Sequence, residues 1–220
     1  MSLRTAIINN ALRLSLFALC TTALIAGVYQ LTASKIEQSQ QQHLLASLNE
    51  LIPASRYNNA LLEDTLAIND QTLLHLEQPE TAYRARFNQQ DVAVIFPVIA
   101  PNGYSGKIKL LVAIEPNGIL AGVRVLQHKE TAGLGDAIEK NKSDWIDVFM
   151  QRSLSNTLSS AWQVKRDGGE FDQFTGATIT PRAVVKAVHN ALLYYEHHKS
   201  QLFSPHPSPL LKESIMSQQP

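Results

Sequence analysis

The longest apolar stretch of the chain lies close to its N-terminus. An uncharged run from Leu14 to Leu31 follows Arg4 and Arg13. As a helix, this run of about 18 residues would be roughly 27 Å long, close to the thickness of the hydrocarbon core of a bilayer. A cleaved secretory leader is the alternative, although its apolar region is usually shorter. The pattern therefore predicts a transmembrane anchor over residues 1–34, and the two arginines favour an N-terminus inside the cell.

The pattern becomes mixed from Lys35 onward. Leucines recur at helical spacing at the end of this segment, at Leu44, Leu45, Leu48 and Leu51. This spacing predicts that the helix continues as an amphipathic stalk, which Pro53 ends. Residues 60–80 are rich in leucine but show no clear period, so the pattern places no element there. We interpret residues 35–80 as a helical stalk and connector.

Branched and aromatic side chains gather in the middle of the chain, in the runs 91–100, 107–115 and 119–127. Such runs are typical of β-strands. Pro97 indicates an edge or a bulge in the first run, because proline cannot donate a hydrogen bond to a neighbouring strand. The Pro-Asn-Gly turns between the runs are too short for crossover helices. We therefore predict consecutive antiparallel strands joined by hairpins.

The second half of the chain combines short elements with one long helix. The pattern predicts short helices at 136–140 and 144–152 and a further strand at 161–165. A last helix begins after Pro181, where apolar residues recur at helical spacing. These residues are Val184, Val185, Val188, Leu192 and Tyr195. Strands followed by helices predict an α+β fold, in which the last helix packs on an antiparallel sheet.

Composition and charge restrict what this domain can do. The folded domain would cover residues 81–196, and the proline- and serine-rich residues 197–220 are predicted to form a disordered tail. The formal net charge is +0 and no basic stripe is visible, so we expect no nucleic-acid partner. Cys20 is the only cysteine, which excludes disulfides within the chain and iron–sulfur clusters held by its cysteines.

The stretch from Asp172 to Thr178 reads Asp-Gln-Phe-Thr-Gly-Ala-Thr. It leads into the last helix, for which Thr180 is the predicted N-cap and Pro181 the first helical residue. A helix N-terminus carries unpaired N–H groups and a partial positive charge, so it favours a phosphate. The small residues before Thr178 leave room for a bulky ligand near the backbone. Thr178 would thus present its hydroxyl where a phosphate is held.

A second stretch, His128 to Gly135, leaves the third predicted strand and reads His-Lys-Glu-Thr-Ala-Gly-Leu-Gly. Gly133 and Gly135 frame a leucine and let the backbone bend around a flat group, while Glu130 and Thr131 add polar groups. On its own this stretch is equally compatible with a plain glycine turn. Because histidine titrates near neutral pH, His128 is a candidate proton relay, although an electron carrier does not require one.

The motif Asp-x-x-Thr-Gly-Ala-Thr resembles the flavin-attachment motif of a membrane redox family. Residues 130–135 are similar to that family's Glu-Thr-Pro-Gly-Leu-Gly, with Ala132 in place of the proline, and residues 103–106 are similar to its Gly-Tyr-x-Gly turn. The alanine loosens the loop without removing a flavin-contacting side chain. With the membrane anchor, the chain resembles the G subunit of the Rnf/Rsx electron-transport complexes. Their FMN-binding domain is shared with the C subunit of the sodium-pumping NADH:quinone reductase.

The resemblance implies a covalent cofactor, FMN, joined to the hydroxyl of Thr178 through a phosphoester bond. A separate periplasmic flavin transferase would move FMN from FAD onto that hydroxyl and would read Asp172 as part of the motif. The implied flavin-binding residues are Thr178, Thr175, Gly176, Ala177, Glu130, Thr131, Gly133, Leu134, Gly135 and Tyr104. The sequence shows no catalytic triad, paired carboxylates or metal cluster, so the chain would carry electrons rather than act as a self-contained enzyme.

The resemblance also implies a location and partners. The chain would cross the inner membrane once, in contact with the lipid bilayer, and would place its domain on the periplasmic side among the other subunits of an Rnf/Rsx complex. Such a complex links ferredoxin and NAD(H) to an ion gradient or, in some bacteria, to reduction of a redox-sensing regulator. Two alternatives remain open. One is a free-standing periplasmic flavin reductase with His128 as its proton donor, and the other is a flavin-free anchored scaffold.

Overall fold

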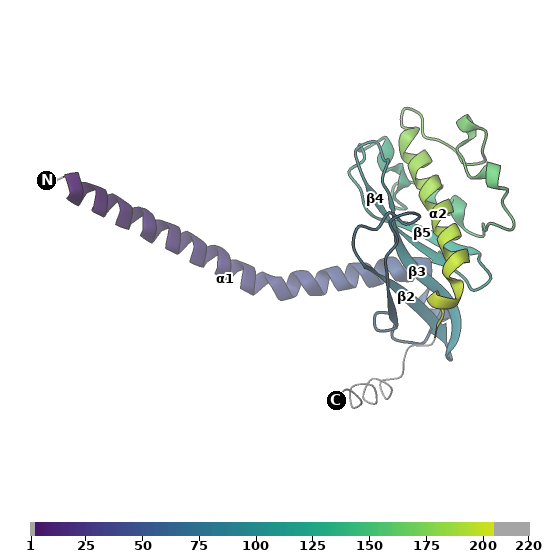
Figure 1. Ribbon diagram of the computed structural model, residues 1–220, viewed down its shortest axis with the longest axis horizontal. Coiled ribbons are helices and arrows are strands. Elements are labelled where there is room, and N and C mark those ends of the chain that lie inside the picture. Colours follow the sequence, from purple (N-terminus) through teal and green to yellow (C-terminus); the bar gives the residue numbers. More distant parts are fainter. Residues whose placement is uncertain (1–2, 205–220) are drawn as a thin grey trace. The chain divides into compact units, whose positions relative to one another are not determined.

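The computed structural model describes residues 3–204 (Figure 1). The chain divides into two compact units, Met1–Ala46 and Ser47–Pro220. Helix α1, Leu3–Leu51, provides all the described structure of the first unit. Within it, Ile7–Ala33 is long and apolar enough to cross a membrane, and none of its most apolar window is buried in the protein. The predicted N-terminal apolar helix is confirmed, and its uncovered apolar surface suits a lipid environment.

The end of α1 belongs to the folded unit. Leu48 and Leu51 are buried there, as the leucine spacing predicts for an amphipathic helix. The helix ends at Leu51, just before Pro53, and a 3-10 helix, η1, follows at Ala54–Arg56. The continuation of the N-terminal helix is therefore confirmed.

Five antiparallel strands form one sheet, in the order β1-β2-β3-β4-β5 (Figure 1). Their bounds are β1 Thr65–Ile68, β2 Glu80–Phe87, β3 Gln90–Ala100, β4 Ile108–Ile114 and β5 Leu120–Gln127. The three predicted strands are β3, β4 and β5, so their antiparallel order is confirmed. Strand β2 pairs with β3 only as far as Ile95. Pro97 therefore lies where β3 has a partner strand on one side alone, which is the predicted edge position.

Sequence reasoning missed β1 and β2. Arg84, in the middle of β2, is almost fully buried and pairs with Asp64 at 2.7 Å. Its guanidinium also donates to the carbonyl oxygen of Ser204 at 2.6 Å. A buried charge of this kind hides the alternation of apolar and polar residues that identifies a strand. Strand β1 has only four residues, which is too short for the alternation to show.

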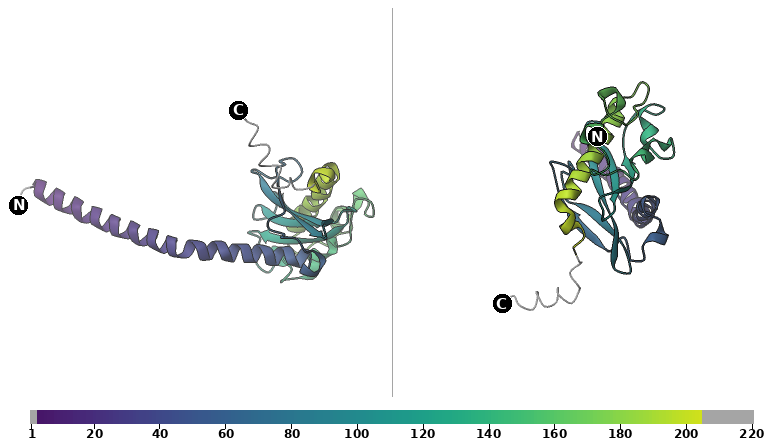
Figure 2. Two further views of the ribbon diagram at one scale, coloured as in Figure 1. Left: turned by 90° about the horizontal axis from the view of Figure 1, so that it is seen from below. Right: turned by 90° about the vertical axis from the view of Figure 1, so that its right-hand side faces the viewer.

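Helix α2, Ile179–Leu202, lies along one face of the sheet and contacts β3 and β4 (Figure 2). All the residues of the predicted apolar stripe are buried: Val184, Val185, Val188, Leu192 and Tyr195. The helix continues past residue 196, because Leu202 is buried and the ring of Phe203 packs edge-on against Tyr195. The predicted tail is therefore wrong for residues 197–202, and residues 205–220 of that prediction lie outside the described part of the chain.

Short 3-10 helices connect β5 to α2. They are η2 Gly135–Ile138, η3 Asp144–Phe149, η4 Ser159–Ala161 and η5 Lys165–Asp167. The helices predicted at 136–140 and 144–152 correspond to η2 and η3, which are shorter. The strand predicted at 161–165 is wrong, since only Val164 forms a single bridge, to Phe171. Its apolar residues instead join an aromatic cluster, in which Trp162 packs against Phe149 and Phe171.

Candidate functional site

A tight turn presents the threonine motif. The N–H of Ala177 donates to the carbonyl oxygen of Phe174 at 3.1 Å and closes a four-residue turn. Gly176 has φ 81° at the third position, which is where a type II turn needs a positive φ. Thr175 lies at the second position and is exposed. The ring of Phe174 packs on Trp145, with centroids 5.1 Å apart, and fixes the start of the turn on the domain.

The start of α2 differs from the prediction. The helix begins at Ile179, so its N-cap residue is Thr178 rather than Thr180. Thr178 already has helical dihedral angles, φ −70° and ψ −28°, and its carbonyl accepts the N–H of Arg182 at 3.3 Å. Pro181 is therefore the third helical residue, where its missing N–H costs nothing because first-turn N–H groups have no partner inside the helix.

The threonines of the motif have three different environments. Thr175 is exposed at the tip of the turn. Thr180 is completely buried, and its hydroxyl donates to the carboxylate of Glu130. Thr178 is partly exposed, and its side chain makes no capping hydrogen bond to α2. Of these hydroxyls, that of Thr178 alone is both accessible and at the helix start.

Thr178 lines a pocket of about 300 Å³, which we call the threonine pocket. Its lining residues are Tyr104, Glu130, Thr131, Leu134, Gly135, Gly176, Ala177, Thr178, Ile179 and Thr180. The pocket thus joins the turn after β3, the loop after β5 and the start of α2. All the site residues predicted from the sequence are present except Thr175 and Gly133. Sequence reasoning missed Ile179 and Thr180, because it placed the helix start two residues too late.

Glu130 connects the walls of the threonine pocket. Its side chain is buried, and its carboxylate accepts the backbone N–H groups of Tyr104 at 3.2 Å and Ser105 at 2.9 Å. The hydroxyl of Thr180 is the third donor. A Cβ atom at Gly135 would lie 2.9 Å from the Cβ of Glu130 and 3.0 Å from the hydroxyl oxygen of Thr180. Gly135 is therefore needed because it leaves room for this contact, rather than because the backbone must bend.

Gly133 has a different role in the same loop. It adopts φ 77°, a conformation that side chains disfavour, and its N–H donates to the carboxylate of Asp136 at 2.7 Å. Nothing lies within 4 Å of the position that its Cβ would occupy. Gly133 shapes the loop and does not line the pocket.

His128 stabilises the loop through a hydrogen bond to its backbone. Its Nδ1 accepts the N–H of Glu130 at 2.9 Å, and its Nε2 lies 2.6 Å from the carboxylate of Glu139. Because Nδ1 is an acceptor, the neutral ring carries its proton on Nε2 and donates it to Glu139. His128 does not line the threonine pocket. His128 therefore stabilises the loop and does not contact a ligand in the threonine pocket.

The rim of the threonine pocket is apolar. Tyr104, Leu134 and Ile179 are 68%, 45% and 43% exposed, and each comes from a different wall of the pocket. Exposed apolar side chains that gather around a pocket indicate a ligand or partner with an apolar surface. Among residues 3–204, no lysine or arginine lines this pocket. A phosphate in it would depend on the N–H groups of Ile179 and Thr180 at the helix start.

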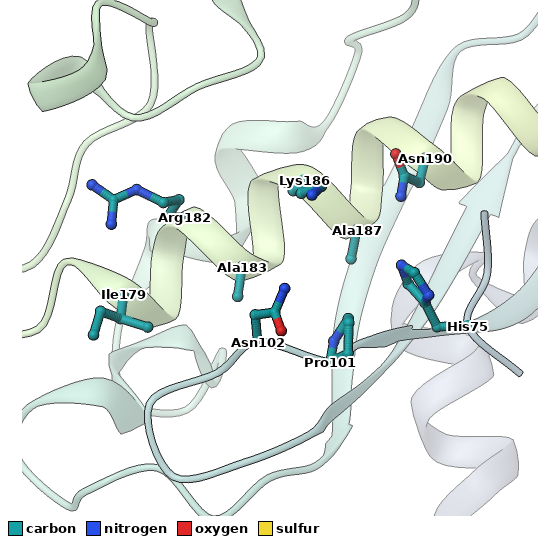
Figure 3. Close-up of a pocket in the computed structure, with 9 residues that line it drawn as sticks. All are labelled: His75, Pro101, Asn102, Ile179, Arg182, Ala183, Lys186, Ala187 and Asn190. Atoms are coloured by element: carbon teal, nitrogen blue, oxygen red, sulfur yellow. The ribbon is translucent and has the colours of Figure 1, made fainter. Parts of the chain in front are cut away.

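A second pocket, of about 350 Å³, lies on the other side of Ile179 (Figure 3). We call it the asparagine pocket, and its lining residues are His75, Pro101, Asn102, Ile179, Arg182, Ala183, Lys186, Ala187 and Asn190. Figure 3 shows His75 and Asn102 facing α2, while Arg182 extends away from them. Arg182 binds Asp167 through two hydrogen bonds of 2.6 and 2.9 Å. This pocket contains no hydroxyl that could form a phosphoester.

Comparison with known proteins identifies the family. The model of the FMN-binding domain matches residues 103–193, and that of the RnfG N-terminal region matches residues 1–51. The G subunit of the ion-translocating oxidoreductase complex of Pseudoalteromonas atlantica is 48% identical over 90% of this chain and 92% of its own length. The corresponding proteins of Shewanella baltica and Pseudomonas aeruginosa are 45% and 46% identical over 92% of this chain. They are covered over 95% and 94% of their lengths.

The chain belongs to the RnfG family. The family and the α+β fold predicted from the sequence are thereby confirmed. The FMN-binding match includes Tyr104, the loop at 128–135 and the start of α2, so it contains every wall of the threonine pocket. FMN fits these residues, because the pocket offers an apolar rim for a flat ring and N–H groups with a hydroxyl for its phosphate.

Proposed function

We propose that this protein is an electron-carrying subunit of an ion-translocating oxidoreductase complex and that its FMN is bound covalently through a phosphoester to Thr178. The observation that supports this most directly is the contrast between the motif threonines. Thr175 is exposed and does not line the pocket, Thr180 is buried on Glu130, and Thr178 presents an accessible hydroxyl in the pocket at the start of α2.

FMN and the protein would have separate roles in electron transfer. Bound FMN supplies the electron-transfer chemistry, and the protein supplies attachment, orientation and electrostatics. The Ile179 and Thr180 N–H groups would hold the phosphate, and the apolar rim would hold the ring. A pocket of this size leaves part of a large ligand exposed, which suits exchange of electrons with neighbouring subunits. The names of the relatives support a place among the subunits of a complex.

Attachment would need an external catalyst. The Thr178 oxygen would attack the FMN phosphorus of FAD, the bond to the AMP half would break, and the threonine proton would leave. A hydroxyl near pH 7 is a poor nucleophile without a base or a metal ion. Glu130 cannot serve as the base, because three donors already occupy its carboxylate. A periplasmic flavin transferase would supply the catalyst. It could recognise the carboxylate of Asp172, which is exposed and pairs with Lys165 at 2.6 Å.

The free-standing reductase is the weaker alternative. It requires a proton donor beside the flavin, and the sequence offered His128 for that task. In the structure, both ring nitrogens of His128 are engaged, by Glu130 and Glu139, and the ring lies outside the threonine pocket. The flavin-free scaffold would make the convergence of the motif residues on one pocket accidental.

The proposal places the chain in the inner membrane, with Ile7–Ala33 as a single anchor in contact with lipid and the domain in the periplasm. Arg4 precedes this segment, and Arg13 lies near its start, just before the uncharged run from Leu14 to Leu31. Basic residues at this end favour a cytoplasmic N-terminus. A reporter that is active only outside the cytoplasm, fused near Ser200, should be active. Activity of a cytoplasm-only reporter at the same position would contradict this topology.

The attachment is tested by in-gel fluorescence. The full chain, produced together with a flavin transferase, should give a UV-fluorescent band after denaturing electrophoresis. Thr178→Val should abolish the band, because it removes the oxygen and keeps the shape of the side chain. Thr178→Ser should keep it, and the matched control Thr175→Val should fluoresce like the unmodified chain. A band that persists in Thr178→Val would refute the proposed attachment site.

A further inference from the structure

We infer that Glu130 is a positioning residue that also sets the reduction potential of the flavin, by fixing a negative charge in the wall of the threonine pocket. The inference rests on the proposed function, because it requires FMN in that pocket. It concerns a task that the motif resemblance does not assign. The resemblance makes Glu130 one of several flavin contacts, whereas the structure shows it at the centre of the hydrogen bonds that assemble the site.

The partners of Glu130 come from different walls of the pocket. Its carboxylate joins the turn after β3, through the N–H groups of Tyr104 and Ser105, to α2, through the hydroxyl of Thr180. Its own N–H donates to His128, which in turn contacts Glu139. Glu130 therefore links the walls of the pocket through its side chain and the base of the loop through its backbone N–H.

Thr180 lies two residues after Thr178 in the first turn of α2. Its contact with Glu130 therefore fixes the place at which the attachment hydroxyl emerges. The neighbouring glycines agree with this account. A Cβ atom at Gly103 would lie 2.9 Å from an oxygen of the Glu130 carboxylate, and one at Gly135 would lie 3.1 Å from the other oxygen.

The Glu130 carboxylate accepts hydrogen bonds but has no basic partner in the described part of the chain. Three donors point at the carboxylate, which suits the ionised form, since that form only accepts hydrogen bonds. Within residues 3–204, none of the ion pairs involves Glu130, and no lysine or arginine lines the pocket. Reduction brings negative charge to a flavin. A negative charge without a basic partner in the same low-dielectric wall disfavours that change, so Glu130 holds the reduction potential down.

The test is a redox titration of the full flavinylated chain in detergent. Glu130→Gln keeps the size of the side chain and removes its charge. We expect it to favour the reduced flavin at least tenfold, a rise of about 59 mV in a one-electron midpoint potential. The matched control is Glu139→Gln, the same substitution in the same hydrogen-bonded chain but outside the pocket, and its shift should be much smaller. The Glu130→Gln shift should persist at 1 M salt, because a buried charge is screened little.

Positioning is tested separately through Thr180. Thr180→Val removes a donor to Glu130 and leaves the charge, so flavin attachment by the transferase should slow at least tenfold while the potential of the attached flavin moves less than in Glu130→Gln. Thr180→Ser restores the donor and should restore the attachment rate. Unchanged attachment in Thr180→Val would refute the positioning role.

Several outcomes would overturn the charge effect. They are a potential in Glu130→Gln equal to that of the unmodified chain, an equal shift in Glu139→Gln, or a shift that disappears at high salt. If Glu130→Gln does not fold, the unmodified chain still gives a test. Its midpoint potential should lie below that of free FMN under the same conditions, and a value at or above it would refute the inference. A fluorescent band in Glu130→Gln, with the same midpoint potential as the unmodified chain, would refute this inference alone. No fluorescent band in the unmodified chain would refute the proposed function.

Discussion

Two pockets of similar size flank the start of α2 and share Ile179, yet their chemistry is opposite. The asparagine pocket is the larger and contains Lys186 and two amide side chains, which are the groups expected to attract a free phosphate. The threonine pocket contains a buried carboxylate and no basic side chain. Under the proposed attachment to Thr178, a phosphate held by a covalent bond would not need a cluster of cations. The proposal therefore assigns the site by the hydroxyl of Thr178 rather than by the volume or charge of the pocket.

The largest expected effect comes from filling the space beside Glu130. Gly135→Ala would place a methyl group against the Cβ of Glu130 and the hydroxyl of Thr180, which are both buried. Overpacking of this kind costs about 1–3 kcal/mol, and here it would separate Glu130 from Thr180. We expect most of the flavin attachment to be lost, measured as the in-gel fluorescence of equal amounts of chain.

Gly133→Ala is the control for that variant, because it adds the same methyl group to the same loop. Its Cβ would meet no atom within 4 Å, so the only cost is the positive φ, about 1 kcal/mol. Flavin attachment should be close to that of the unmodified chain. Equal losses in the two variants would show that the loop responds to any strain and that the Glu130 contact has no special part.

A smaller effect is expected from the asparagine pocket. Lys186→Gln combined with Asn190→Ala removes a charge and an amide from its lining. Substitutions of surface residues that touch no special feature usually change stability by less than about 0.5 kcal/mol. Flavin fluorescence and the visible absorption spectrum should not change. Loss of flavin in this double variant would show that the two pockets form one binding site and would break the comparison.

The smallest effect concerns Arg182, which lines the asparagine pocket and binds Asp167. The hydrogen bonds from Arg182, helped by its positive charge, lower the pKa of Asp167. A lowered pKa stabilises the folded state above the ordinary pKa of the carboxyl group, and this contribution is lost as the pH falls through the lowered value. Asp167→Asn should therefore melt slightly below the unmodified chain at pH 7, and the two should converge in acid. A difference that persists at low pH would assign the effect to packing.

The sequence predicted the parts of the site that local patterns encode. Residues of the Thr-Gly-Ala-Thr turn and of the loop after β5, except Thr175 and Gly133, meet at one pocket. The start of α2 could not be predicted, because Thr180 and Pro181 look like an N-cap and a first helical residue. In the fold, the hydroxyl of Thr180 is taken by Glu130, which lies 50 residues earlier. The local sequence around Thr180 does not predict its contact with Glu130.

The same limit applies to the fold. The strands with apolar runs were predicted, while β2 was hidden by the buried Arg84. The end of α2 was missed because polar residues at 196–201 precede the buried Leu202. Both features depend on contacts between residues far apart in the sequence. Arg84 of β2 binds Asp64, and it also binds the carbonyl oxygen of Ser204, just after the end of α2. Local pattern identifies an element, and long-range contacts set its limits.

The central claim is that flavin is attached to Thr178, and peptide mapping tests it most directly. Trypsin should release the peptide from Asp167 to Arg182, which contains Thr175, Thr178 and Thr180. In chain produced with a flavin transferase, this peptide should gain the mass of FMN less one water, and fragmentation should place the added mass on Thr178. An adduct on Thr175 or Thr180, or an unmodified peptide from flavin-containing protein, would contradict the account.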